Sequence, residues 1–378
     1  MRNASLANFV AALLILTIPI GSGEASAEGL EPIEYTLGDG TVIRFSGQIN
    51  MGVLHYDDGE DDFTNFVDNE NSSSRARLEI FTESDNGWKF EARFEAEYQP
   101  LASNVVSQHD ESPDWDFHST YIRKAEVAFS NERFGKLWLG QGSMATDGVA
   151  EIDNSGTGVI AYSAIPDTAG GYFFRFADDG LSDITIGSAF SNFDGHGRKL
   201  RVRYDSPTFH GFAFRTSYGE NALGQNDDPL YDLAAYYSNE SDQFDLDAGV
   251  GFARNEESET DLLSGSISAL HKPTGVSLTL AAGREILDGT EGSFGYVKLG
   301  YQREFFDIGS TAFSIDYYFG SDLAAADSNS DSIGLAAVQN IDDYNLQLWA
   351  LWRGYSYDDD AGEYDDGQAV FGGALFKF

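Results

Sequence analysis

The sequence predicts an all-β fold, a transmembrane antiparallel β-barrel of 16 strands, and three observations lead to it. Apolar residues recur at every second position in many short segments, as in 244–253 and 344–353, which is the period of a β-strand. The last of these segments runs to the final residue, Phe378. Short connections alternate with longer acidic ones along the chain. A closed barrel explains all three, because its last strand must pair with its first.

The N-terminal segment, residues 1–27, has the pattern of a secretory signal peptide. Arg2 supplies a positive charge, the stretch from Phe9 to Ile20 is apolar, and Ala25-Ser26-Ala27 is a small-residue cleavage site. A membrane anchor is the alternative, but the apolar run is too short to span roughly 30 Å comfortably. We therefore expect cleavage after Ala27, which leaves residues 28–378 as a single barrel domain.

The charge of the chain is strongly acidic. There are 62 acidic and 23 basic residues, a formal net charge of −39. Nucleic-acid binding needs a basic face, so the sequence predicts no nucleic-acid partner. An acidic surface attracts cations, which predicts cation preference for any channel the chain forms. The sequence contains no cysteine, which excludes disulfides and cysteine nucleophiles.

The period-two segments number sixteen, an even count, as a single-chain bacterial barrel requires. An eighteen-stranded barrel would result if 172–194 formed a further hairpin, because Tyr172–Phe176 and Ile184–Phe190 alternate weakly. The sixteen predicted strands are 42–56, 73–84, 87–99, 118–130, 134–143, 198–206, 211–220, 229–239, 243–254, 260–271, 275–285, 292–304, 309–320, 330–339, 343–355 and 366–378.

One connection, 144–197, is far longer than the others. Connections of that length in a compact fold are usually functional. The remaining connections alternate between short turns and long loops, as the periplasmic turns and extracellular loops of a barrel do. A secreted, soluble β-rich surface or adhesion protein would also show alternating strands, although its loops need not alternate in length.

Three stretches resemble a known family. They are Arg123–Phe129 with Phe134–Gln141, then Val202–Phe209 with Gly211-Phe212, and the terminal Phe378. They are similar to the Gram-negative general (diffusion) porin family, and most of all to the acidic porins of marine and photosynthetic proteobacteria. The resemblance covers essentially the whole mature chain.

The resemblance implies an outer-membrane channel for passive diffusion of small hydrophilic solutes and ions, assembled as a homotrimer among lipid and lipopolysaccharide. It also implies that 144–197 folds inward and narrows the pore. The C-terminal strand, with Phe376 and Phe378, would be the signal for the barrel-assembly machinery. A substrate-specific channel is the alternative within the same fold.

The alternation assigns the basic residues of several strands to the lumen, since their neighbours of opposite parity are apolar. Arg123 is placed in the lumen by the resemblance alone, because Lys124 and Glu126 would then face lipid at a cost. The predicted basic wall of the constriction is Arg44, Arg75, Arg77, Arg93, Arg123, Arg201 and Arg203.

The long connection carries the opposite charge, with Asp147, Glu151, Asp153 and Asp167 as the predicted constriction acids. An acidic loop facing a basic wall would set a transverse field that filters solutes by size and polarity. The alternative is that the arginines pair with lumen carboxylates such as Glu79, Glu91 and Glu95 and hold the wall rigid.

No cofactor is required by this reading, and catalysis finds little support. The six histidines lack metal-ligand spacing, and no Gly-x-Ser-x-Gly elbow occurs. Asp327, Asn329 and Asp331 place oxygen ligands at alternate positions. Ca²⁺ takes many oxygen ligands, so we consider Ca²⁺ or another divalent cation at the acidic loops. A solvated acidic rim is the alternative.

Overall fold

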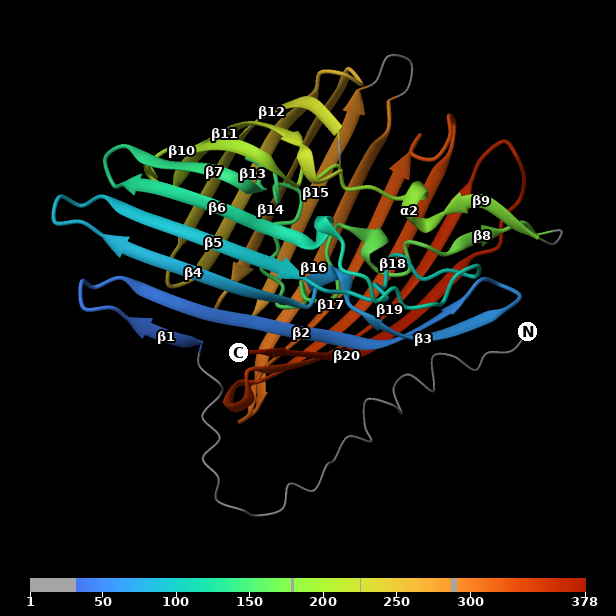
Figure 1. The fold of residues 1–378 in the computed structure, drawn as a ribbon. Helices are drawn as coiled ribbons and strands as arrows, with labels where there is room; N and C mark the ends of the chain where they lie inside the picture. The colour runs from blue at the N-terminus through green and yellow to red at the C-terminus, as the bar shows by residue number, and fades with distance from the viewer. Residues whose placement is uncertain (1–31, 178–179, 225, 287–290) are drawn as a thin grey trace.

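A computed structural model describes residues 32–177, 180–224, 226–286 and 291–378 (Figure 1). The predicted signal segment, 1–27, lies outside the described residues. Among the described residues, no helix combines the length and the apolar character needed to cross a membrane.

A closed antiparallel barrel of sixteen strands forms the wall, which confirms the predicted fold. Each strand pairs with the next, and the last pairs with the first, from Gln48 opposite Lys377 to Asp57 opposite Gln368. Every predicted segment corresponds to one wall strand. The wall strands are β2 (Val42–Asp57), β4 (Arg75–Glu83), β5 (Lys89–Glu97), β6 (Ile122–Asn131), β7 (Gly135–Ser143), β10 (Arg198–Asp205), β11 (Phe212–Asn221), β12 (Asn226–Glu240), β13 (Phe244–Asn255), β14 (Thr260–His271), β15 (Val276–Ile286), β16 (Ser293–Phe306), β17 (Gly309–Ser321), β18 (Asn329–Ile341), β19 (Leu346–Asp358) and β20 (Gly367–Lys377).

Two short strands extend the wall at β2 and were not predicted. β1 (Ile33–Thr36) pairs with the start of β2, and β3 (Asp62–Asp68) pairs with its second half. β4 pairs with the first half of β2 only, so β3 completes that side of the strand. Both strands are short, and β3 lies in a segment whose acidic composition predicts a loop.

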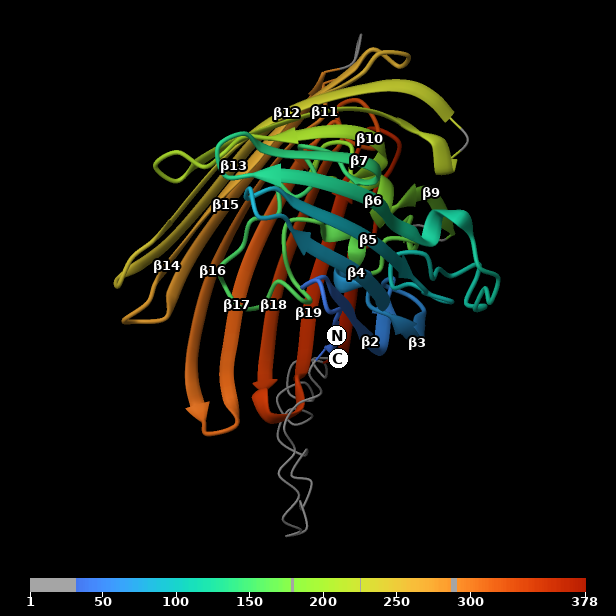
Figure 2. The ribbon, with the colours of Figure 1, turned by 60° about the vertical axis from the view of Figure 1, so that its left-hand side comes forward.

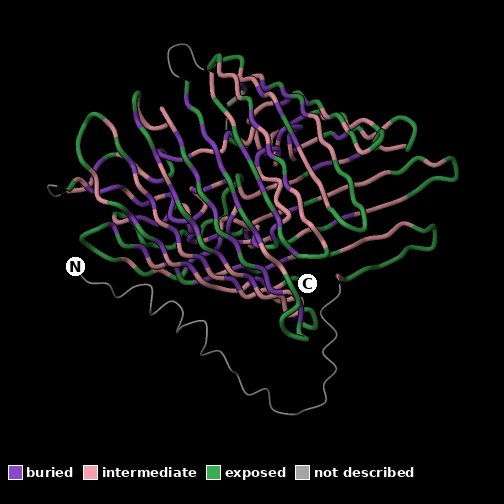
Figure 3. The backbone as a smooth tube through the Cα atoms, turned by 180° about the vertical axis from the view of Figure 1, so that it is seen from behind, coloured by how far each residue is buried: buried purple, intermediate pink, exposed green. Residues whose placement is uncertain are grey.

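The two faces of the wall differ as a membrane barrel requires. Outward positions carry apolar side chains that are exposed in the isolated chain, among them Leu78 at 42%, Phe94 at 49% and Leu299 at 52%. Inward neighbours such as Arg77, Arg93 and Lys298 are polar or charged. Figure 3 shows the resulting alternation of exposed and buried positions along the strands.

The long connection 144–197 enters the barrel, and its segment 173–185 lies toward the end of the barrel opposite the short turns, as Figure 1 shows; Figure 2 gives a second view. It contains the 3-10 helix η3 (Ile165–Asp167), the strands β8 (Phe173–Arg175) and β9 (Leu181–Thr185), and the one-turn helix α2 (Ile186–Ala189). β8 and β9 pair with each other in a separate two-stranded sheet. The hairpin considered for 172–194 therefore forms, but it does not enter the wall, which keeps sixteen strands.

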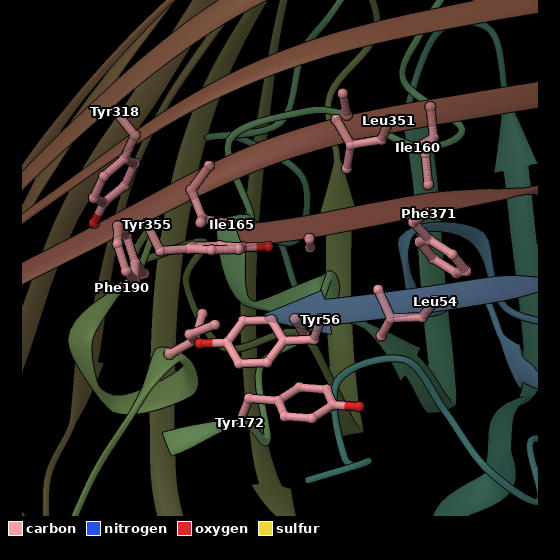
Figure 4. Packing of buried hydrophobic residues seen from close by; sticks show 14 of the residues in the cluster. Leu54, Tyr56, Ile160, Ile165, Tyr172, Phe190, Tyr318, Leu351, Tyr355 and Phe371 are labelled. Carbon is pink, nitrogen blue, oxygen red and sulfur yellow. The ribbon is translucent and has the colours of Figure 1, made fainter. Parts of the chain in front are cut away.

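An apolar cluster holds the loop against the inner face of the closing strands (Figure 4). The rings of Tyr172 and Tyr56 stack with their centroids 4.2 Å apart, and the ring centroids of Phe190 and Tyr355 are 5.9 Å apart. Phe371, which points inward from β20, is fully buried. β19 and β20 thus carry apolar side chains on both faces, because lipid covers one face and the loop covers the other, although Arg353 of β19 also points inward and pairs with Asp316.

Candidate pore constriction

Polar contacts attach the loop to one half of the inner wall. Asp153 forms an ion pair with Lys298 at 2.7 Å, and Lys298 also donates to the carbonyl of Ala161 at 2.6 Å. Further along, the Tyr355 hydroxyl donates to the carbonyl of Thr168 at 2.8 Å. These contacts leave the opposite wall, β4 to β7 and β10, facing the loop across the remaining lumen.

The cations of that opposite wall are mostly paired with carboxylates of the same wall. Arg93 contacts Glu79 at 3.0 Å and Glu91 at 3.3 Å, and Arg77 forms an ion pair with Glu95. This matches the alternative left open by the sequence, in which the arginines stiffen the wall. Each paired cation presents a reduced charge to the lumen.

A β-bulge explains how Arg123 and Lys124 both face the lumen. Glu95 pairs with Lys124 while Ala96 pairs with Ile122, so β6 has one extra residue at Arg123. A bulge of this kind lets two successive side chains share a face. Arg123 contacts Glu95 at 2.9 Å and also pairs with Glu97. The lipid-facing charge that the sequence suggested for Lys124 and Glu126 is therefore avoided.

Two predicted wall arginines bind backbone carbonyls near the end of β7, from which the loop begins. Arg201 donates to the carbonyls of Ser143 and Gly140, both at 3.1 Å. Arg203 donates to the carbonyl of Ser143 at 3.2 Å and pairs with Asp205 at 2.7 Å. Their donors are thus used largely on carbonyls at the end of β7 and on wall carboxylates, and their part in the constriction stays a prediction.

Arg44 makes its contacts outside the loop. It pairs with Glu34 of β1 and lies over the Phe81 ring, 5.3 Å from its centroid. β1 joins β2 at the end of the barrel with the short turns (Figure 1). The alternation in the sequence predicted that Arg44 faces the lumen, but it could not predict how far along the barrel axis the residue lies. We therefore correct its predicted position from the constriction to the end of the barrel with the short turns.

The loop acids fall into two groups. Asp153 is an anchor: the Lys298 ammonium outweighs the effect of burial and lowers the pKa of the carboxyl. Glu151 accepts from the Asn192 amide at 3.0 Å, and burial raises its pKa to about 7. Asp167 accepts from the Tyr162 hydroxyl, and burial also raises its pKa well above the usual value.

Asp147 is half-buried at the start of the loop and adds negative charge close to Glu151 and Asp194. Asp194 lies near the other end of the same loop. It accepts from the backbone N–H groups of Gly148 and Ala150, at 2.6 and 2.8 Å. Asp194 therefore closes the two ends of the loop onto each other.

Two charged groups near the loop were missed. Glu70 lies in η1 (Glu70–Ser72), and burial raises the pKa of its carboxyl to about 7, with a further contribution from nearby Glu97. Arg198, the first residue of β10, lies close enough to Glu70, Glu151 and Asp167 to affect all three carboxyls. Only the fold brings these connections together, so no local pattern could have identified them.

The outer end of the loop is tied to acidic connections. Arg175 of β8 contacts Asp58 at 2.9 Å and Asp61 at 3.2 Å. The Phe176 ring stacks on Tyr364, which precedes β20, at 4.9 Å. Arg175 thus pairs with carboxylates of the acidic connection between β2 and β3.

The residues considered for a metal do not converge. Asn329 accepts from Ser321 at 3.3 Å, Asp331 accepts from Tyr317, and the Asp327 N–H donates to Asp322. Within the described part of the chain, no group of three or more His, Cys, Asp or Glu side chains is arranged to hold a metal ion.

Phe376 and Phe378, the predicted assembly signal, lie at the closing seam. Their ring centroids are 6.3 Å apart, and the Phe378 ring lies 6.0 Å from that of Phe45. Both aromatic residues belong to the alternate positions of the last strand that face the lipid.

Comparisons with known proteins agree with this geometry. The family model described as Gram-negative porin matches residues 10–348. No curated protein matches the chain. Among solved structures, the anion-selective porin from Comamonas acidovorans is 16% identical, with 89% of this chain and 100% of that chain covered and a TM-score of 0.60. In-vitro folded OmpT of Vibrio cholerae, in its trimer form, is 12% identical, with 89% and 99% covered and a TM-score of 0.56.

A third solved structure, Salmonella typhi OmpF in complex with daunomycin, is 14% identical, with 92% and 100% covered and a TM-score of 0.52. At such identities the likeness to solved structures concerns the fold. The family match indicates a channel rather than an enzyme, located in the outer membrane. The chain belongs to the Gram-negative porin family and is an outer-membrane diffusion channel.

Proposed function

We propose that this porin lets small hydrophilic solutes and ions diffuse passively through a water-filled lumen, without energy coupling or catalysis. One observation carries the proposal: the loop 144–197 is anchored to one half of the wall and leaves a charged lumen against the other half. Charged groups of both signs around a narrow passage favour polar solutes over apolar ones, because apolar solutes must displace ordered water.

A general channel is favoured over a substrate-specific one by the position of the inner aromatic side chains. Tyr56, Tyr172, Tyr318 and Phe371 are fully buried under the loop. They are therefore not available as a stacking surface along which one class of solute could move.

The homotrimer belongs to the same proposal. The OmpT structure of similar fold is described as a trimer form. The outward positions of β2 to β6 include small residues, Gly47, Ala76, Ala92 and Ala125, and small residues let membrane-embedded surfaces approach closely. Lipid, lipopolysaccharide and the barrel-assembly machinery are the other partners we propose.

We propose no bound cofactor. Divalent cations enter the proposal only as loosely held counter-ions of the acidic loops, and chelation should leave the conductance unchanged. A conductance that falls with a chelator and returns with Ca²⁺ would contradict this.

The direct test is the current through the purified protein in a planar bilayer under a KCl gradient. We expect stable channels that close in three steps. Channels without threefold closure would overturn the trimer, and the absence of channels from well-folded, heat-modifiable protein would overturn the diffusion pore.

A further inference from the structure

A groove of about 340 Å³ opens on the outer face of the last four wall strands, β17 to β20. Tyr317, Ile333 and Trp352 form its apolar part. These side chains occupy outward positions of their strands, and Tyr317 and Ile333 are exposed at 44% and 41% in the isolated chain. The groove therefore faces the lipid and not the lumen.

The absence of a side chain at Gly354 makes the hollow. Gly354 lies opposite Ile333 of β18 and Gln368 of β20 in the strand pairing. A Cβ at Gly354 would lie 3.6 Å from the Trp352 ring and 3.7 Å from the Ile333 side chain, which are ordinary contact distances. The wall would thus accept a larger residue. Aromatic side chains at this level are general to membrane barrels, whereas the space between them belongs to this position.

The groove changes from apolar to polar along the strands. Toward the middle of the wall, Trp352 is followed by outward apolar residues such as Leu335. Toward the long loops, Asp331 and Gln368 line the groove, and Asp331 accepts a hydrogen bond from the Tyr317 hydroxyl. The groove therefore spans the boundary between the hydrocarbon and the polar layer of the outer leaflet.

The polar end of the groove favours an uncharged headgroup that carries hydroxyls. Asp331 and Asp366 line this end, and none of the described residues around the groove is a lysine or an arginine. Carboxylates accept hydrogen bonds from hydroxyls and repel phosphates. The rings of Tyr317 and Trp352 offer flat apolar surfaces against which the C–H face of a sugar ring can pack.

We propose that this groove binds the sugar headgroup of an outer-leaflet glycolipid, whose acyl chains lie along the apolar outer wall. The inference rests on the proposed function, because it assigns a site to one of the lipid partners of the outer-membrane channel. A phospholipid lacks the ring that fills the space over Gly354, and its phosphate would meet the carboxylates of Asp331 and Asp366.

The test is native mass spectrometry of the purified porin, with n-dodecyl-β-maltoside as the sugar-bearing probe. Dodecylphosphocholine has the same alkyl chain and carries a phosphate, so it is the matched probe. We expect each chain to retain a dodecyl maltoside molecule at collision energies that remove dodecylphosphocholine. Equal retention of the two probes would overturn the proposal.

Gly354→Leu fills the groove and should lower the retained maltoside at least about tenfold, because close-packed side chains leave no room for a sugar ring. Gly372→Leu is the matched control. Gly372 also occupies an outward position, and a Cβ there has only the carbonyl oxygen of Trp349 within 4 Å, at 3.8 Å. Equal losses in the two variants would show that maltoside binds to the outer wall in general, and would overturn the site.

Trp352→Leu tests the same site without filling it, since it keeps an apolar side chain and removes the ring. We expect it to weaken retention severalfold, as for the loss of one aromatic contact, and unchanged retention would contradict the proposal. Loss of the trimer in Gly354→Leu but not in Gly372→Leu would assign the groove to a subunit contact and would also overturn it.

The lipid site and the diffusion pore fail separately in this experiment. All three variants should conduct in planar bilayers as the wild type does, because the altered residues lie outside the lumen. Conducting channels without selective maltoside retention would overturn the glycolipid site alone. A well-folded wild type that retains maltoside but does not conduct would overturn the diffusion function on which the inference rests.

Discussion

Gly47 and Phe378 exchange two backbone hydrogen bonds across the seam that closes the barrel. The N–H of Gly47 donates to the carbonyl of Phe378 at 2.8 Å, and the N–H of Phe378 donates to the carbonyl of Gly47 at 3.0 Å. β1 then continues along the same side of β2, with Ile33 opposite Phe45. The C-terminal residue and β1 together form one composite strand, so no edge is left unpaired at the seam.

Gly47→Ala should destabilise this seam. A Cβ at Gly47 would lie 2.6 Å from the Phe378 ring and 2.8 Å from the carbonyl oxygen of Arg75. Overpacking of this kind costs about 1–3 kcal/mol. The measurement is the temperature at which the folded, fast-migrating form disappears on a gel. Gly38→Ala is the matched control, since a Cβ at Gly38 has no neighbour within 4 Å. Equal transition temperatures would contradict the prediction.

Lys298→Met should release the loop from the wall. The Lys298 side chain is fully buried, and its removal leaves Asp153 without its counter-ion, a loss of about 3–5 kcal/mol for a buried pair. Unfolding in urea and single-channel conductance both report the change. The double variant with Asp153→Asn should recover much of the stability, because the unpaired charge is gone.

The Asp153–Lys298 ion pair should also make the stability of the protein depend on pH. The pKa of Asp153 is lowered in the folded protein, so its ion pair stabilises the wild type above the ordinary pKa of 3.8 and is lost as pH falls through the lowered value. In Lys298→Met, protonation relieves the buried charge, so the defect should shrink on acidification. A defect that grows at low pH would argue against Asp153 as its cause.

Ion selectivity should change as pH passes through about 7, the raised pKa of Glu70 and of Glu151. Protonation below that pH removes negative charge from the constriction and should shift the reversal potential toward anions. Since ionisation is disfavoured in the fold, this contribution to stability is greatest below the ordinary pKa of 4.5 and falls as pH rises through about 7.

Glu151→Gln should flatten this titration, and Glu83→Gln, an exposed acid at the end of β4, should leave it unchanged. The experiment is a series of reversal potentials from acid to alkaline buffers. A Glu151→Gln titration as steep as that of the wild type would assign the transition to other groups.

Arg175→Gln should loosen the outer hairpin of the loop. Arg175 binds Asp58 and Asp61, and the neighbouring Phe176 stacks on Tyr364. Loss of the ion pairs leaves ring contacts such as Phe176–Tyr364 and hydrogen bonds such as Gln108–Phe173 to hold the hairpin, so we expect severalfold more brief closures in current recordings. Arg133→Gln, at the β6–β7 turn, is the control. Unchanged current noise would show that the hairpin is held without Arg175.

The positions of the wall strands were predictable because a strand between lipid and lumen must alternate along its own sequence. Segment 260–271 coincides with β14, and 198–206 matches β10 within one residue. β1 and β3 were not predictable, since β1 has four residues and β3 has seven, and their pairing depends on where β2 happens to have a free edge.

The candidate site was only partly predictable. The alternation of apolar and polar residues identified Arg77 and Arg93 as lumen residues, but it could not predict that carboxylates of the wall neutralise them. Arg123 needed the bulge opposite Glu95 to face inward beside Lys124. Glu70 and Arg198 were missed because they meet the loop only in the folded barrel.

The sequence by itself determined the sixteen-stranded wall, the closing role of Phe378 and the presence of one unusually long connection, because period-two alternation and connection length are local properties of the chain. The tertiary structure alone decided the path of that loop and the pairing of Lys298 with Asp153. Those features depend on contacts between residues far apart in the sequence, where burial and charge compensation decide which groups meet.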